Sequence, residues 1–226
     1  MVRQSKVLGA LAGLVVQGAL AAQPPVKREE KADFEVDDSF QADGGVQIHF
    51  DLQKPGSTAQ PPFRALDRDD RLGTIIKEPV HLCVMRVSYV VEKDVAFFTR
   101  ERLLDLAYMR ALAPQLQLSA RADGGFQVGQ SPASDLSLEF HDDQRGPWLV
   151  QENVNFARVL GWRTGAWSAT WTFHESLGPG RTRVTALSLS YLYNVPPGFL
   201  GGADRFRRET IDGALEVITR LRGFKP

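Results

Sequence analysis

The sequence has one cysteine among its 226 residues, and this scarcity excludes an intramolecular disulfide. Cys83 lies in the apolar run 81–85. We expect it to be a small buried side chain, because a reactive thiol needs an electropositive and partly exposed setting. The four histidines show neither a paired helical spacing nor a cysteine pair beside them, which gives a zinc site little support. The sequence therefore predicts no metal and no cofactor.

An excess of charge of one sign is also lacking, because 27 Lys and Arg residues balance 27 Asp and Glu residues. Nucleic-acid binding favours a clustered positive field, so we expect no nucleic-acid partner. The sequence contains neither a G-x-S-x-G nucleophile elbow nor a G-x-x-x-x-G-K-[ST] phosphate loop. No residue is therefore predicted to be catalytic.

The longest apolar run lies near the N-terminus, at 7–22, and is interrupted by Gln17. Two basic residues precede this run, and the small residues Ala19 and Ala21 occupy the −3 and −1 positions of a cut after Ala21. A basic start, a short apolar stretch and a small-x-small site mark a secretory signal peptide. An uncleaved anchor needs about 20 apolar residues. We therefore predict a signal peptide at 1–21 and a protein exported to the periplasm or the cell exterior.

Two later stretches differ in composition from the rest of the chain. Residues 22–44 are rich in charge and poor in large apolar side chains, so burial gives little free energy to offset the cost of ordering them. We predict a flexible leader there. Residues 53–80 hold several prolines and a run of mixed charges, which indicates an irregular insertion. The remainder, 45–226, is predicted to be a single domain.

Apolar residues alternate with period two along most of this domain, as they do in half-buried strands. Candidate strands carry the alternating sets Val46, Ile48, Phe50, Leu52; Met85, Val87, Tyr89, Val91; Leu116, Leu118, Ala120; Phe126, Val128; Leu136, Leu138, Phe140; Trp148, Val150; and Trp167, Ala169, Trp171, Phe173. A last strand is expected at 181–193, where the apolar parity slips. A β-bulge and a strand covered on both faces both account for this slip.

Turns and helices separate these strands. Asp123-Gly124-Gly125 and Gly178-Pro179-Gly180 are typical of hairpin turns, which need positive φ angles. The segment 94–113 is predicted to be a helix that Pro114 ends. A closing amphipathic helix is predicted at 203–222, with an apolar stripe of Ile211, Ala214, Leu215, Ile218 and Leu221.

The element order resembles that of the START-like helix-grip superfamily, which includes polyketide cyclases and lipid-transfer domains. The resemblance spans about 81–224 and is strongest in 167–174 (WSATWTFH), in 180–185 (GRTRVT) and in the Pro196-Pro197 loop before the last helix. It implies an α+β fold, with an antiparallel sheet curved around the C-terminal helix and a hydrophobic cavity between them. The extra strand at 46–52 and the insertion after it depart from the pattern.

A lipocalin-like β-barrel is the alternative fold. Gly165-Ala166-Trp167 matches the G-x-W element of lipocalins. That element belongs near the start of a lipocalin domain, whereas here fewer than two hairpins follow it. We therefore rank the barrel below the helix-grip fold.

Aromatic residues gather on the last two strands and provide candidates for a ligand pocket. Trp167, Trp171, Tyr191 and Tyr193 are consistent first with a packed core, and alternatively with cavity walls whose hydroxyl tips orient a ligand. The tyrosines share strand parity with apolar neighbours, so they are candidates to point into a cavity beneath the helix. Arg86 is a further candidate, because a buried pair of Arg86 with Tyr191 or His174 would favour an enzyme.

The loop before the closing helix holds two further candidates, Phe199 and Leu200. Two prolines stiffen its start and glycines loosen its end. These two apolar residues either cap the helix or form a gate that touches the ligand, or transiently a membrane surface, during loading.

The favoured function is an exported, non-covalent carrier of a hydrophobic small molecule or lipid. A cyclase- or dehydratase-type enzyme that uses the same cavity is the second hypothesis. A structural or interaction module with a filled core is the third. A fold by itself does not choose among them.

Overall fold

The computed structural model describes residues 39–42, 45–53, 81–129, 134–144, 146–154, 158–159, 162–163, 165–193, 195 and 202–225. The predicted signal peptide 1–21 lies outside the described residues. So do nearly all of the predicted insertion 53–80 and the loop residues Phe199 and Leu200.

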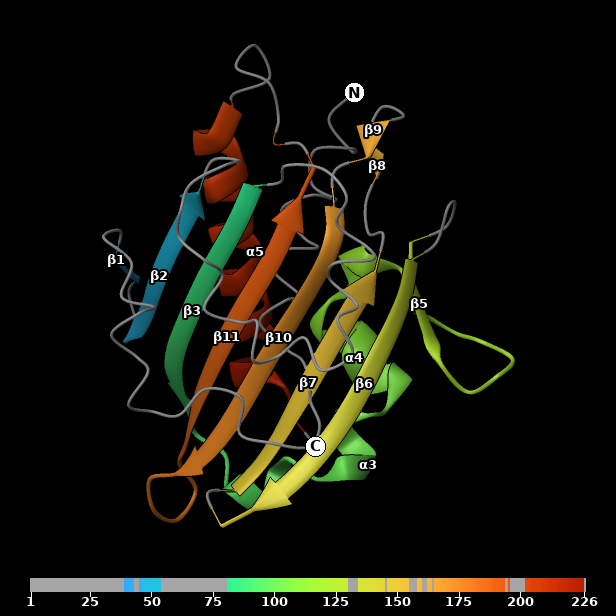
Figure 1. Cartoon of the computed structure of the whole chain (residues 1–226). Helices are drawn as coiled ribbons and strands as arrows, with labels where there is room; N and C mark the ends of the chain where they lie inside the picture. Colours follow the sequence, from blue (N-terminus) through green and yellow to red (C-terminus); the bar gives the residue numbers. More distant parts are fainter. Residues whose placement is uncertain are drawn as a thin grey trace.

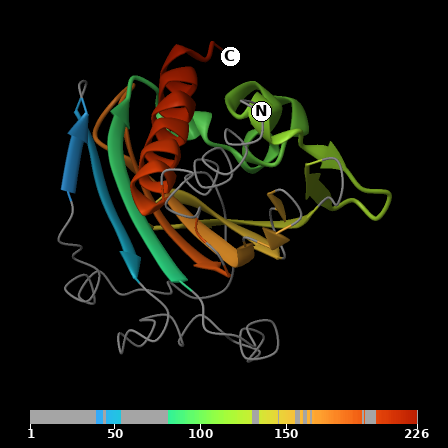
Figure 2. The same cartoon turned by 90° about the horizontal axis from the view of Figure 1, so that it is seen from above.

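One antiparallel sheet of nine strands dominates the described structure, in the order β1-β2-β3-β11-β10-β7-β6-β5-β4. Its strands are β1 (Ser39–Ala42), β2 (Val46–Gln53), β3 (His81–Val91), β4 (Ser119–Ala120), β5 (Phe126–Val128), β6 (Ser134–Asp143), β7 (Gly146–Val154), β10 (Gly165–Ser176) and β11 (Thr182–Leu192). A separate two-stranded ribbon joins β8 (Arg158–Val159) to β9 (Trp162–Arg163). The sheet curves around the long C-terminal helix α5 (Gly202–Gly223) (Figures 1 and 2). It ends at β1 and β4 without closing, so the α+β helix-grip prediction is confirmed and the lipocalin-like barrel is wrong.

The central hairpin β10–β11 forms as its glycine turn predicts. Gly178 and Gly180 have φ angles of 120° and 70°, which side chains with a Cβ rarely adopt. β11 pairs with β3 residue by residue without a shift, so no bulge explains the parity slip. Instead all residues from Ser188 to Leu192 are buried, because both faces of β11 are covered at this end.

The segment 94–113 is not the single helix that its composition predicts. It consists of the 3-10 turn η3 (Val95–Phe97), then α3 (Arg100–Leu103) and α4 (Leu106–Leu112), with the 3-10 turn η4 (Pro114–Leu116) following. The side chains of Asp94, Thr99 and Asp105 each accept a hydrogen bond from a backbone N–H at the start of a new piece. These N-caps offer the backbone partners that a continuous helix would otherwise supply. Part of the strand predicted around Leu116–Ala120 is likewise η4.

The closing helix follows its prediction closely. Ile211, Ala214, Ile218 and Leu221 are buried, and Leu215 is half-buried. Two hydrogen bonds fix its C-terminal end to β3 and the turn after it: Arg222 Nε donates to Val90 O at 3.1 Å, and Lys93 Nζ donates to Phe224 O at 2.6 Å. Among the described helices, none has the length and apolar character that crossing a membrane requires.

Four residues of the predicted flexible leader form a strand. β1 pairs antiparallel with β2, so that Ser39 lies opposite His49 and Ala42 opposite Val46. Backbone hydrogen bonds to the exposed edge of β2 order this stretch without a large apolar side-chain set, which the composition of 22–44 lacks.

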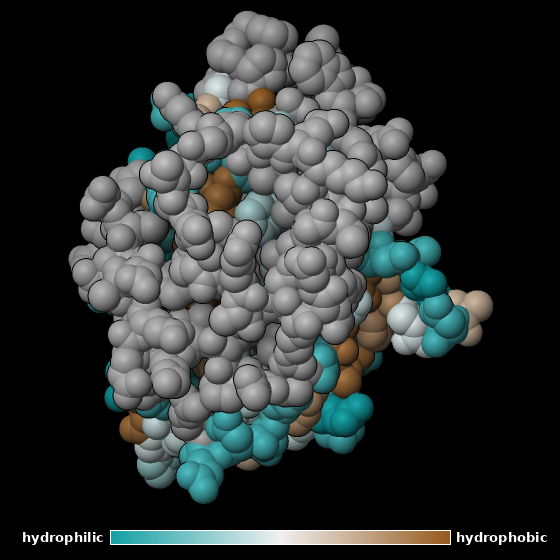
Figure 3. Space-filling model, in the orientation of Figure 1, coloured by the Kyte–Doolittle hydropathy of each residue, from teal (hydrophilic) through white to brown (hydrophobic). Residues whose placement is uncertain are grey.

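The ends of the hairpins form a polar rim. Asp142, Asp143, Gly180 and Arg181 are exposed at the β6–β7 and β10–β11 turns. In the space-filling view, hydrophilic residues gather at the lower end of the molecule, where these turns lie (Figure 3).

Candidate ligand-binding site

The sheet has a concave face toward the helices and a convex face away from them. Leu221 of α5 shares a small cavity with Val184 of β11, and with Thr172 and His174 of β10. Phe206 of α5 packs on Phe50 of β2, with ring centroids 6.2 Å apart. Since side chains alternate along a strand, these contacts fix which residues of every strand are concave. α5 lies over the β2–β3 side of the concave face, and α3 and α4 lie over the β6–β7 side (Figures 1 and 2).

The middle of the concave face is polar. Six uncharged side chains from β7, β10 and β11, which we call the polar floor, are each at most 6% exposed: Gln151, Asn153, Ser168, Thr170, Ser188 and Ser190. They form two rows in register, because Thr170 lies opposite both Ser188 and Gln151, and Ser168 lies opposite both Ser190 and Asn153. Three strands and two rows give a floor of roughly 10 Å by 7 Å.

Hydrogen bonds within the described residues satisfy only part of this floor. The hydroxyl oxygens of Thr170 and Ser188 lie 2.9 Å apart and share a hydrogen bond. Asn153 is 4% exposed, yet its Oδ1 is buried with no hydrogen-bond partner. Leaving a buried polar atom unsatisfied costs about 1–3 kcal/mol. This acceptor on the concave face therefore lacks the hydrogen-bond donor that buried polar atoms usually have.

Apolar side chains border the polar floor on both sides in the same two rows. Toward β2 and β3 they are Phe50, Leu52, Cys83 and Met85, and toward β6 they are Leu136 and Leu138. Cys83 is 4% exposed, as the sequence predicts, and burial raises the pKa of its thiol. A surface of mainly apolar walls with a few convergent polar groups is the usual composition of a small-molecule site.

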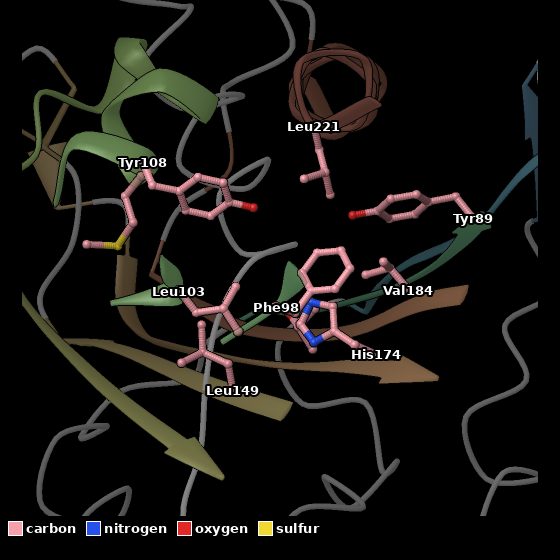
Figure 4. Close-up of a pocket in the computed structure, with 10 residues that line it drawn as sticks. Tyr89, Phe98, Leu103, Tyr108, Leu149, His174, Val184 and Leu221 are labelled. Carbon is pink, nitrogen blue, oxygen red and sulfur yellow. The ribbon is translucent and has the colours of Figure 1, made fainter. Parts of the chain in front are cut away.

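A small cavity of about 30 Å³ lies at the other end of the concave face (Figure 4). Tyr89 of β3 and Tyr108 of α4 point their hydroxyl groups toward each other across it, with His174 beneath them (Figure 4). Burial raises the pKa of both phenols, which keeps them protonated at neutral pH. This volume holds about one water molecule, so the cavity does not admit an organic ligand.

His174 is fixed in one protonation state. Its Nδ1 lies 3.0 Å from the carbonyl oxygen of Pro147, which only accepts, so Nδ1 carries the proton and Nε2 is left as an acceptor. The ring stacks on Phe98 with centroids 4.1 Å apart. Burial lowers the pKa of His174 to about 4, so the imidazole is neutral at pH 7.

Four residues that the sequence singles out lie on the convex face, so the expectation that they line a cavity beneath the helix is wrong. Trp171 is adjacent to the concave Thr172 in β10, so its side chain points to the convex face. Trp167 shares this face with Trp171, and so does Tyr191, which lies opposite Trp167 in β11. The rings of Trp167 and Tyr191 pack against each other with centroids 5.8 Å apart. Arg86 lies opposite Leu187 on the same convex face. A ligand contact of these residues on that face stays a prediction.

The pairs that would favour an enzyme do not form. Arg86 and His174 lie on opposite faces of the sheet. Arg86 and Tyr191 share a face, but Tyr191 pairs with Leu82, which is four residues from Arg86 and thus about 13 Å along the strand. Tyr193 follows the end of β11 and is half-buried.

The polar floor itself was not predicted as a site. Its signal is present in the sequence, because a hairpin turn at 178–180 brings Ser168 opposite Ser190 and Thr170 opposite Ser188. Two consecutive strands thus place short hydroxyl side chains in register on one face, where a core sheet would carry larger apolar residues.

An open antiparallel sheet gripping a long C-terminal helix defines the START-like helix-grip fold, and this chain has that fold. Human StAR-related lipid transfer protein 5 is similar over 96% of this chain and 98% of its own, with a TM-score of 0.51 and 10% identity. The lipid transfer and protein localization domain of human StarD13 matches over 88% of this chain and 94% of its own, with a TM-score of 0.42 and 14% identity. Norcoclaurine synthase from Thalictrum flavum matches over 62% of this chain and 88% of its own, with a TM-score of 0.40 and 11% identity. No family model and no curated protein matches the sequence.

Proposed function

We propose that this protein is an exported carrier that binds a hydrophobic small molecule or lipid, without covalent chemistry, on the concave face of its sheet. The observation that carries the proposal is the polar floor bordered by apolar side chains on the concave face of the sheet, with an orphaned acceptor at Asn153. A filled core gains nothing from such a floor, because burying amide and hydroxyl groups opposes folding unless they are hydrogen-bonded.

The fold supports the same class of function. Human StAR-related lipid transfer protein 5, which shares this fold at 10% identity, is by its name a lipid transfer protein. The N-terminal pattern at 1–21 supports export, with a basic start and small residues at the cleavage positions. The enzyme hypothesis lacks comparable support, because the arginine pairs that favour it do not form.

Native mass spectrometry of the full protein, purified without detergent, tests this proposal. We expect an added mass that organic extraction removes, and saturable uptake of the hydrophobic fluorophore N-phenyl-1-naphthylamine by the extracted protein. Gln151→Trp puts a bulky side chain in the polar floor and should abolish uptake. Ser137→Trp is the matched control, because Ser137 is exposed on the convex side of the neighbouring strand β6. If the protein shows neither an added mass nor saturable uptake, the result supports the module with a filled core instead.

Loading is proposed to pass through the loop that holds Phe199 and Leu200, with transient contact to a membrane surface. Both residues are apolar and precede the closing helix in the sequence, and for apolar residues before a helix we expect either a surface position or packing under the helix. Replacing both by Ser should slow uptake of the fluorophore from phosphatidylcholine vesicles while leaving the melting temperature nearly unchanged. Unchanged uptake, or a large loss of stability, would show that the two residues are core.

A further inference from the structure

We infer that the ligand carries a hydroxyl group, and that this group sits on the polar floor with its O–H donated to Asn153 Oδ1. This inference rests on the proposed function and adds to it the chemical class of the ligand. It starts from the one polar atom of the floor that is both buried and without a hydrogen-bond partner in the described part of the chain.

The floor matches a hydroxyl in hydrogen-bonding capacity. Its serine and threonine hydroxyls both donate and accept, and its two amides supply donors and acceptors. A ligand hydroxyl also does both, so it satisfies the Asn153 amide and a neighbouring group such as Ser168 at the same time. An ether or a ketone only accepts, and a hydrocarbon does neither, so each of them leaves Oδ1 unsatisfied.

The floor also matches a hydroxyl in size and charge. An area of roughly 10 Å by 7 Å suits one small polar group rather than a large headgroup. Among the described residues, the concave face of β3, β7, β10 and β11 has no Asp, Glu, Lys or Arg. Glu152, the carboxylate nearest in sequence, is convex and accepts from Trp167 Nε1 at 2.7 Å. A formal charge on the ligand therefore finds no counter-charge in the floor.

A carboxylate headgroup is the competing ligand, because α5 carries one cation on the inner side of its first turns. Arg207 is half-buried, one turn before the buried residues Thr210 and Ile211. A carboxylate, however, has no proton to donate to Oδ1 at neutral pH. Water is the other competitor, since a single water also satisfies a buried acceptor. A matched series of ligands distinguishes a hydroxyl group from these two competitors, the carboxylate and the water molecule.

The test measures displacement of N-phenyl-1-naphthylamine from the full protein by four probes of equal chain length: 1-dodecanol, its methyl ether, dodecane and dodecanoate. Wild type should prefer 1-dodecanol over the ether by roughly 5- to 150-fold, the effect of leaving one buried group unpaired at a cost of about 1–3 kcal/mol. Asn153→Leu should lower that ratio to about 1, because both ligands then meet an apolar side chain. Ser168→Ala, in the same row, should weaken the alcohol and the ether alike and leave the ratio unchanged, because both ligand oxygens accept from Ser168.

Ser137→Ala is the control that should keep the full preference, since this side chain is exposed on the convex side. Equal binding of the alcohol and the ether to wild type, or tighter binding of dodecanoate, would overturn the inference while leaving the carrier function in place. A preference that persists in Asn153→Leu would overturn it as well. If none of the four probes binds wild type, the proposed function fails and the inference fails with it.

Discussion

Replacing Asn153 by leucine should make the ligand-free protein more stable. Asn153 is 4% exposed and its Oδ1 has no hydrogen-bond partner, so the folded state bears a desolvation cost of about 1–3 kcal/mol that the unfolded chain does not. Leucine has the same branching and the same number of side-chain heavy atoms but is somewhat larger; it carries no polar atom and suits a strand better than asparagine does. A polar-to-apolar change on a sheet floor then stabilises, where most substitutions destabilise.

The size of the gain follows from two opposing effects. Removing the unsatisfied amide contributes about 1–3 kcal/mol, and repacking a side chain of different shape costs below about 1.5 kcal/mol. The expected net gain in the free energy of unfolding is about 1 kcal/mol. For a domain of this length that gain raises Tm by about 2–4 °C.

Urea denaturation followed by circular dichroism, on protein extracted with organic solvent, measures this change. Ser137→Leu is the matched control and should change the free energy of unfolding by less than about 0.5 kcal/mol, because Ser137 is exposed. A loss of more than about 1 kcal/mol in Asn153→Leu would refute the reasoning, since it would mean that the Asn153 amide is hydrogen-bonded in the ligand-free fold.

Three further expectations concern the rest of the molecule. Ile218→Ala should lower the free energy of unfolding, measured by urea denaturation, by roughly 2–5 kcal/mol, because Ile218 is 1% exposed. Arg220→Ala removes an exposed ion pair and should lower it by at most about 0.5 kcal/mol. Equal losses would contradict the assigned helix face. His174 has a folded pKa of about 4 against 6.5 when unfolded, so the unfolded state binds the extra proton; stability should be full above about pH 6.5 and fall toward pH 4 by up to about 1.4 kcal/mol per pH unit. If the free energy of unfolding of His174→Phe falls with pH just as steeply, His174 is not the source of the pH dependence. Protein recovered from its native host should begin at Ala22 by intact mass; an uncleaved chain would contradict the export proposal.

Elements of the fold were predictable because local periodicity determines them. Period two marked β2, β3, β7 and β10, and the spacing of Ile211, Ala214, Ile218 and Leu221 marked α5. The prediction of a single helix at 94–113 was wrong because it rested on the apolar residues of the segment and left its capping residues out of account. Asp94, Thr99 and Asp105 are all residues that begin helices, and each of them does so here.

The face of the sheet on which each site residue lies was not predictable from the alternation of side chains alone. Period two divides β10 into a Trp face and a Ser/Thr face, but it does not say which of them meets the helix. Large aromatic residues suggested the inner face. In the structure Trp167 and Trp171 are convex and also buried, at 5% and 2% exposed. Ser168 and Thr170 take the concave face, so hydrophobicity pointed to the wrong side of the sheet.

Photo-cross-linking tests most directly whether a ligand binds on the concave face. A long-chain alcohol with a diazirine in its alkyl tail is bound to the full protein and irradiated, and the labelled residues are identified by peptide mass spectrometry. Labels should fall on the concave side chains Met85 and Thr170 and on Phe206 of α5, and excess 1-dodecanol should suppress them. Labels confined to the convex residues Trp171 and Tyr191 would contradict the proposed site.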